Sequence, residues 1–175
     1  MLFVGDGRYR EMPEVPTTDS LLFGDGASAT AIEIEAGNKL LYAQKTDGER
    51  YKYISVGLDG DLTMDGNAVL LFSLNEVCQS IREMRSHFDI QDYYILHQAQ
   101  KLIVDGIARE CDMDMNKVLR SYEEYGNTST ATLPFTICNN AEKIKKKKRV
   151  RFYMCGYGVG LAWSNVVLDM ETDHI

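Results

Sequence analysis

One long amphipathic stripe constrains the fold of this chain more than any other feature of its sequence. Between residues 67 and 88, apolar residues recur at spacings of three and four, namely at Leu70, Leu74, Val77, Ile81, Met84 and Phe88. This spacing places all of them on one side of an α-helix. The sequence therefore predicts a long helix over 67–88 whose apolar side is covered by other elements.

The segments that follow this helix predict strands and further helices. The run "DYYIL" is typical of a short buried strand, and 150–170 indicates a strand, a glycine turn and a second strand. A helix is expected over 98–111, with an inner side formed by Leu102, Ile103, Ile107 and Ala108. Another is expected from Leu133 to about Asn140, because Pro134 is tolerated in a first helical turn. Residues 112–121 begin with aspartates that indicate a helix cap.

The N-terminal third predicts strands joined by glycine-rich turns. Residues 2–4 form a short apolar strand, and 11–20 form a proline-containing loop. Leu21 to Phe23 are expected to be buried, 24–28 to form a tight turn and 29–35 to alternate as a strand. A hairpin is expected over 36–56, with "TDGE" as its turn, followed by a loop over 57–67. The mixture of strands and helices predicts α/β layers.

Composition excludes several classes of function. The length of 175 residues suits about one domain, and the net charge of −7 argues against a nucleic-acid partner. No apolar run is long enough for a membrane span, and the first residues show no signal-peptide core. The four cysteines are far apart without a C-x-x-C pair, which argues against both a metal site and a disulfide framework. We therefore expect a cytoplasmic protein with reduced thiols.

Three features are candidates for a functional site. His97 follows a buried strand directly, which is where α/β sheets bind ligands. Asn127 lies between a turn and a helix, and Gly156, Gly158 and Gly160 allow a backbone to approach a ligand closely. Each also has a purely structural interpretation, since a histidine after a strand, an asparagine after a glycine and a glycine turn between strands are common structural features.

Five segments together resemble a known family. "LLFGDGASATAIE", "LTMDGN", "LHQAQK", "YGNTSTATLPFTI" and "GYGVGLAW" occur here in the order typical of β-ketoacyl-acyl-carrier-protein synthase III enzymes of the thiolase superfamily. The resemblance extends from near Met1 to about Leu168 and concerns the C-terminal part of such an enzyme. It implies an α/β thiolase-like C-terminal half, with layered helices on a mixed sheet, over 36–175. Residues 1–35 would be the last strands of an incomplete N-terminal half.

The resemblance implies an acyltransferase chemistry based on a Cys-His-Asn set. In that family a cysteine is acylated by an acyl-CoA, and decarboxylation of a malonyl-acyl carrier protein gives the carbanion that attacks the acyl group. His97 and Asn127 match the histidine and the asparagine, which stabilise the oxyanion formed on decarboxylation. The match also implies that the backbone N–H of Val159 donates to the oxyanion of the acyl-enzyme. Gln98, Gln100, Gly126, Gly158 and Gly160 match positions that line or support the substrate pocket.

The nucleophile is the main departure from the family. Its cysteine lies at a helix N-terminus in the N-terminal half, where the thiol pKa is lowered, and none of the four cysteines here has that setting. Cys78 and Cys138 lie within predicted helices, Cys111 at a helix end, and Cys155 just before the glycine turn. We therefore expect this chain alone to be inactive. It would be a fragment, a subunit completed by another chain, a non-catalytic partner or an inactive truncated remnant.

The partners implied are small thioesters and another protein chain. Acyl-CoA is the implied substrate and malonyl-acyl carrier protein the implied extender, with no bound cofactor and no metal. Gln100 stands where the family usually has asparagine, and Leu102 where a basic residue often serves carrier-protein docking. The basic run "EKIKKKKRVRF" is either a solvated turn or a dock for acidic carrier protein or CoA phosphates. Because isolated strands expose unpaired backbone, we expect a homodimer or a complementary chain to pair through residues 1–35.

Overall fold

A five-stranded mixed sheet forms the centre of the protein. The computed structural model describes residues 2–7, 20–32, 40–57, 62–87, 91–173 and 175. The strand order is β3 (Leu41–Thr46), β9 (Ala162–Glu171), β8 (Arg149–Gly158), β6 (Tyr93–Leu96) and β7 (Val118–Leu119). β6 is parallel to both of its neighbours, β8 and β7, whereas β9 is antiparallel to both of its neighbours, β8 and β3.

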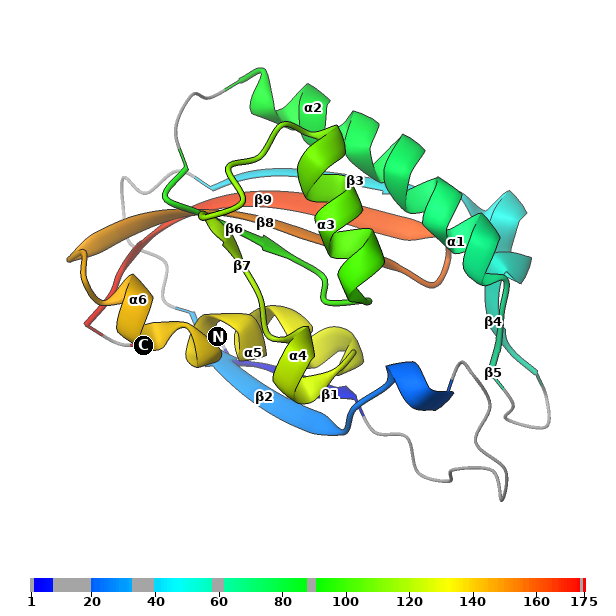
Figure 1. Cartoon of the computed structure of the whole chain (residues 1–175), viewed down its shortest axis with the longest axis horizontal. Helices are drawn as coiled ribbons and strands as arrows, with labels where there is room; N and C mark the ends of the chain where they lie inside the picture. Colours follow the sequence, from blue (N-terminus) through cyan, green and yellow to red (C-terminus); the bar gives the residue numbers. More distant parts are fainter. Residues whose placement is uncertain (1, 8–19, 33–39, 58–61, 88–90, 174) are drawn as a thin grey trace.

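Helices cover both faces of this sheet. Figure 1 shows α1 (Gly66–Phe72), α2 (Cys78–Arg85) and α3 (Lys101–Glu110) on one side, and α4 (Tyr122–Tyr125), α5 (Thr132–Asn139) and α6 (Ala141–Ile144) on the other. All four side chains of β6 are buried, on alternate faces of the sheet. Tyr94 and Leu96 lie in the core under α1–α3, and Tyr93 and Ile95 lie in the core next to α5. A strand covered on both faces reads as a continuous apolar run, which is how "YYIL" appears in the sequence.

The predicted long helix is confirmed with one irregular turn. α1 and α2 are joined by η3 (Ser73–Val77), a π-helical turn, so the helical segment is continuous from Gly66 to Arg85. Val77, Ile81 and Met84 are buried on the predicted side. Phe88 lies outside the described residues. The buried strand at 93–96, the helix over 132–139 and the β8–β9 hairpin are also confirmed.

The predicted hairpin over 36–56 is wrong. β3 pairs instead with β9, with Leu41 opposite Val167, and η2 (Gly48–Tyr53) is a 3₁₀-helix. Asp47, which was expected in the turn, caps η2 by accepting a hydrogen bond from the Glu49 N–H at 3.0 Å. An Asp-Gly pair begins a helix as readily as it makes a turn. The true hairpin is β4 (Ile54–Val56) with β5 (Leu62–Met64), within the segments predicted as strand and loop.

Three smaller predictions are also wrong. The aspartates of 112–121 introduce the strand β7 rather than a helix, because Asp114 accepts the Asn116 N–H in a turn. Leu102 is 61% exposed, since it lies about 100° around α3 from the buried Ile103. Leu21 is 69% exposed, in a surface turn of 3₁₀-helix, η1 (Ser20–Leu22).

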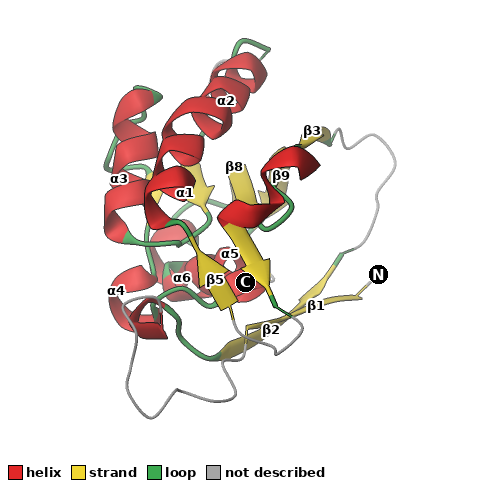
Figure 2. Ribbon diagram, turned by 90° about the vertical axis from the view of Figure 1, so that its right-hand side faces the viewer, coloured by secondary structure: helices red, strands yellow, loops and turns green. Residues whose placement is uncertain are grey.

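The N-terminal strands form a separate two-stranded sheet. β1 (Leu2–Gly7) pairs antiparallel with β2 (Gly26–Ala31), so the expected turn over 24–28 is already strand from Gly26. This pair lies beside α5 on the side away from the main sheet, and Figure 2 shows it separate from β8 and β9. Residues 11–19 of the loop predicted over 11–20 and the end of the strand predicted over 29–35 lie outside the described residues.

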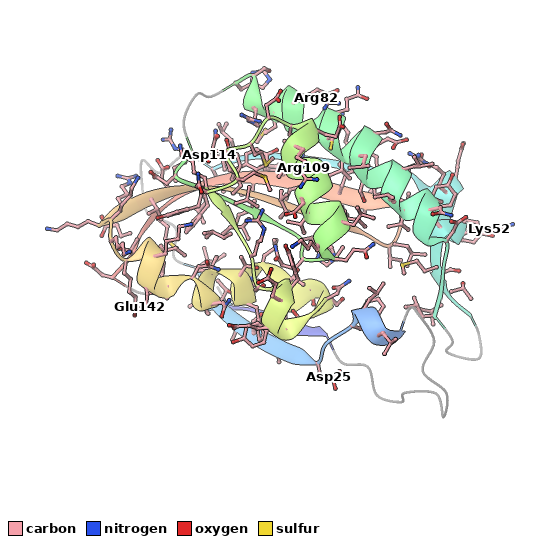
Figure 3. The ribbon with its side chains drawn as sticks, in the orientation of Figure 1. Asp25, Lys52, Arg82, Arg109, Asp114 and Glu142 are labelled. Atoms are coloured by element: carbon pink, nitrogen blue, oxygen red, sulfur yellow. The ribbon has the colours of Figure 1, made fainter. Side chains whose placement is uncertain are left out.

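Many charged side chains lie on the periphery of these layers, whereas Asp105 is buried and paired with Arg120. Figure 3 shows Arg82 and Arg109 on the outer sides of α2 and α3, and Glu142 beyond the end of α5. None of the helices within the described ranges combines the length and hydropathy of a bilayer-spanning segment.

Candidate active site

His97 lies at the carboxyl end of the central strand. It follows Leu96, the last residue of β6, and its N–H donates to the Cys155 carbonyl of β8 at 2.8 Å. The β8–β9 turn continues from the same end of the sheet. His97 therefore directly follows a buried strand, as the sequence predicted. The glycine turn follows β8, the strand next to β6.

The imidazole of His97 is held by two side chains. Its Nδ1 lies 2.8 Å from Oγ1 of Thr132, the first residue of α5. Tyr157 packs at a ring-centroid distance of 5.2 Å and an interplanar angle of 85°, and its hydroxyl donates to the His97 carbonyl at 3.3 Å. The ring lies deep among protein atoms, although part of the residue remains open to solvent. Burial lowers its pKa to about 4, so the ring is neutral at pH 7.

Asn127 is clamped into place by a segment far away in the sequence. Its N–H donates to the Leu22 carbonyl at 2.9 Å, and its carbonyl accepts the Gly24 N–H at 3.0 Å. Gly126, just before it, has φ +63°, a left-handed conformation that favours glycine. Gly24 is needed for close approach, because a Cβ there would be 1.9 Å from the Tyr125 carbonyl oxygen. The segment Leu22–Gly24 thus holds the turn that presents Asn127.

The carboxamide of Asn127 is oriented by its own turn. Its Oδ1 accepts the Ser129 N–H at 2.9 Å, and Asn127 is 9% exposed. Among the described residues no group accepts a hydrogen bond from its Nδ2. The amide oxygen is therefore occupied, and the –NH₂ remains available as a donor.

A continuous chain of hydrogen bonds connects His97 with Asn127. The Thr132 hydroxyl contacts both the Nδ1 of His97 and the Ser129 carbonyl, the latter at 3.0 Å, and Ser129 in turn donates its N–H to Asn127. The two side chains are thus positioned from the same turn and the first residue of α5. Such a network fixes both groups relative to one another.

The glycine turn lies between β8 and β9. Gly158 pairs with Ala162, and Val159 is 64% exposed, so its β-branched side chain points away from the packed interior. Gly160 has φ +141°, and a Cβ there would lie 2.8 Å from the Ala162 nitrogen. A Cβ at Gly158 would meet no atom within 4 Å, which leaves this backbone open to approach.

The two glutamines that follow His97 have structural contacts. Gln98 is fully buried, donates to the Leu96 carbonyl at 2.6 Å and accepts the Ser121 N–H at 2.9 Å. It fastens the end of β6 to the segment after β7, and so supports His97 rather than lining a pocket. Gln100 precedes α3, and its carbonyl accepts the Val104 N–H at 3.0 Å.

None of the four cysteines is placed as a nucleophile at this site. Cys78, Cys111 and Cys155 are buried in the core under α1–α3, and Cys138 is exposed on α5. Cys155 is close to His97 through its backbone only, and burial raises the pKa of its thiol. No cluster of three metal-ligating side chains is present in the part of the chain that the structure describes.

Sequence reasoning missed the residues that support the site. Thr132 and Ser129 were visible only as small residues before a helix, and Tyr157 only as part of the predicted glycine turn. The role of Leu22–Gly24 was hidden as well, because its backbone contacts leave no side-chain pattern.

Comparisons with known proteins show which family this chain is similar to. Residues 86–170 match the family model for the C-terminal part of 3-oxoacyl-[acyl-carrier-protein] synthase III. The chain is 31% identical over 171 residues to a β-ketoacyl-[acyl-carrier-protein] synthase III of Streptococcus gordonii, and 29% identical over 172 residues to one of Lactococcus lactis. Each alignment covers 86% of this chain and 53% of the relative, so the chain spans about half the length of the curated relatives it matches.

Solved structures show the same fold. The 3-oxoacyl-[acyl-carrier-protein] synthase III of Pseudomonas aeruginosa aligns with a TM-score of 0.82 at 24% identity, over 97% of this chain and 57% of that one. The enzyme of Aquifex aeolicus gives the same four values. The fold is therefore thiolase-like, as the resemblance implied, and the similarity to the C-terminal part of synthase III is confirmed.

Proposed function

We propose that this chain, similar over most of its length to the C-terminal part of β-ketoacyl-acyl-carrier-protein synthase III, carries the His/Asn half of an acyltransferase that condenses thioesters. The observation that supports it most is the hydrogen-bonded chain from Asn127 to His97 at the end of the sheet. This series of hydrogen bonds fixes two polar side chains at one place. Among the described residues, the Asn127 –NH₂ and the Nε2 of His97 have no hydrogen-bond partner.

The proposed chemistry is stabilisation of a thioester oxyanion. When a malonyl thioester loses carbon dioxide, negative charge develops on its carbonyl oxygen. Fixed donors in a site of low dielectric stabilise such charge without reorganisation, and losing one typically costs about a hundredfold or more in rate. Asn127 supplies its –NH₂, and His97 supplies Nε2 whenever that nitrogen carries a proton. The backbone N–H of Val159 is the proposed donor to the acyl-enzyme oxyanion.

The attacking thiol comes from residues other than these 175 in this proposal. Three of the four cysteines are core residues, and Cys138 is on the exposed side of α5. Whether the thiol belongs to another part of the same polypeptide or to a complementary chain, its place is beside His97. We place the protein in the cytoplasm, where such thiols stay reduced.

The proposed substrates are an acyl-CoA and a malonyl-acyl carrier protein. The lysine run 145–148 is not the proposed dock for either, because it precedes Arg149 at the start of β8, whereas Cys155 is level with the end of β6. Six residues of strand at about 3.3 Å each separate the two levels by roughly 20 Å. We expect that charge reversal at Lys145, Lys146 and Lys148 leaves carrier-protein affinity at low salt unchanged; a large loss would assign the run to docking.

Asn127→Ala tests the proposed function directly. The assay is condensation of an acyl-CoA with malonyl-acyl carrier protein, in the full protein or complex that contains the nucleophile. We expect a loss of about a hundredfold or more, because one oxyanion donor is removed. Asn116→Ala is the matched control, since Asn116 is exposed and its side chain has no described hydrogen bond.

A second candidate function is a non-catalytic subunit that shapes a partner's pocket. The placement of the cysteines favours this candidate, because none of the four lies where it could act as the nucleophile beside His97. The same variant separates the two candidates. A scaffold with an Asn127→Ala change should condense thioesters at the unmodified rate as long as the complex still assembles.

A further inference from the structure

The hydroxyl of Thr132 lies between two groups that compete for its single proton. Thr132 is 1% exposed and begins α5. Its Oγ1 is 2.8 Å from the Nδ1 of His97 and 3.0 Å from the Ser129 carbonyl oxygen. Both distances are those of good hydrogen bonds, so the position of this proton decides what the histidine presents to the site.

Only one proton arrangement makes both hydrogen bonds. A carbonyl oxygen can only accept, so the contact with Ser129 requires the Thr132 O–H. The hydroxyl oxygen then accepts, and Nδ1 of His97 has to donate to it. If the hydroxyl turned toward Nδ1 instead, its bond to Ser129 would be lost. Linked bonds running in one direction also strengthen one another.

The remaining contacts of His97 leave its tautomer undecided. Tyr157 packs against the ring and donates to the main-chain carbonyl, so it bonds to neither ring nitrogen. Thr132 is the only group among the described residues that bonds to the imidazole. Burial keeps the ring neutral at pH 7, where it carries one proton. The hydrogen bond at one nitrogen sets which of the two is protonated.

We propose that Thr132 is a positioning residue that holds the resting His97 in its Nδ1–H tautomer and leaves Nε2 bare. Its meaning for catalysis rests on the proposed function. A bare Nε2 accepts before it can donate, so the first group to engage His97 is a proton donor such as the nucleophile thiol. That proton moves from sulfur to Nε2 and leaves a thiolate beside an imidazolium, while Nδ1–H stays on Thr132. The negative charge of the thiolate stabilises the charged ring, which burial alone disfavours. Nε2 becomes an oxyanion donor only after this step.

Nuclear magnetic resonance of the ¹⁵N-labelled protein tests the tautomer without any assay of activity. At pH 7, long-range proton–nitrogen spectra should show His97 with a protonated Nδ1 and a pyridine-type Nε2. In Thr132→Val, which keeps the shape but loses the hydroxyl, the ring should change to the Nε2–H form that unrestrained histidine favours. Thr132→Ser keeps the hydroxyl and should retain the original spectrum.

The proposal is overturned if the unmodified protein shows Nε2–H, or if Thr132→Val leaves Nδ1 protonated. Thermal melting of both variants shows whether they fold. If the valine variant does not, the spectra of the unmodified protein and of Thr132→Ser decide the question. The tautomer and the proposed function fail separately, because condensation by Asn127→Ala is measured independently of the ring's protonation.

Discussion

At the scale of single residues, the hydroxyl of Thr132 connects His97 with the turn that carries Asn127. His97 and Asn127 were found because each follows an element boundary and belongs to a segment that resembles a family motif. Thr132 was invisible, because a threonine among small residues before a helix is ordinary. Its importance depends on its two partners, Ser129 and His97, and the latter is 35 residues away.

The buried histidine predicts how stability depends on pH. The pKa of His97 is about 4 in the folded protein, against about 6.5 for an unperturbed histidine. Between these values the unfolded chain binds the extra proton, so this group makes folding less favourable as the pH falls from about 6.5 toward 4. Urea unfolding at pH 7 and pH 4.5 should therefore show a larger loss for the unmodified protein than for His97→Gln.

The comparison isolates the histidine because all other titrating groups are common to both proteins. Equal losses of unfolding free energy in the two proteins would show that His97 is readily protonated in the folded state. The lowered pKa would then be wrong.

At the scale of elements, local patterns predicted what local interactions determine. The stripe over 67–88 gave a helix because its period is set by one helix face, and the apolar run 93–96 gave β6. β3 was assigned to the wrong partner because its hydrogen bonds go to β9, at the other end of the chain. A strand pattern in the sequence predicts one strand but does not indicate which other strand pairs with it.

Gly24→Ala tests the clamp that holds the Asn127 turn. A Cβ at this position would lie 1.9 Å from the Tyr125 carbonyl oxygen, so the backbone on one side has to move. We expect a loss of about 2 kcal/mol in unfolding free energy, as for other overpacked sites, and a lower condensation rate because Asn127 is displaced.

Gly48→Ala is the control for this prediction. Its Cβ would meet no atom within 4 Å, and we expect a change within about 0.5 kcal/mol. If Gly24→Ala were as stable as Gly48→Ala in thermal and chemical unfolding, the clamp would have no structural role.

At the scale of the whole molecule, the N-terminal strands are set apart from the main sheet. In the described part of the chain, β1 and β2 pair only with each other, in a two-stranded sheet apart from the main one. A two-stranded sheet needs a packed helix to be stable in water, and α5 and η4 (Ser129–Ala131) supply that contact here. This arrangement supports the proposed division into residues 1–35, as strands of another half, and 36–175 as the C-terminal domain.

The outer edges of β1 and β2 predict association. We expect the chain to form dimers or larger assemblies through them, because among the described residues no further strand pairs with either edge. Sedimentation velocity over a range of concentrations measures this directly. A well-behaved monomer at every concentration would contradict it.

In the proposed function, His97 and Asn127 stabilise the same oxyanion. The most direct measurement is the rate of malonyl-thioester decarboxylation in His97→Ala, Asn127→Ala and the double variant, within the assembled enzyme. Because both groups act on one developing charge, we predict that each single change costs about a hundredfold or more. The double change should cost less than the product of the two. Single variants that decarboxylate at the unmodified rate would contradict the account.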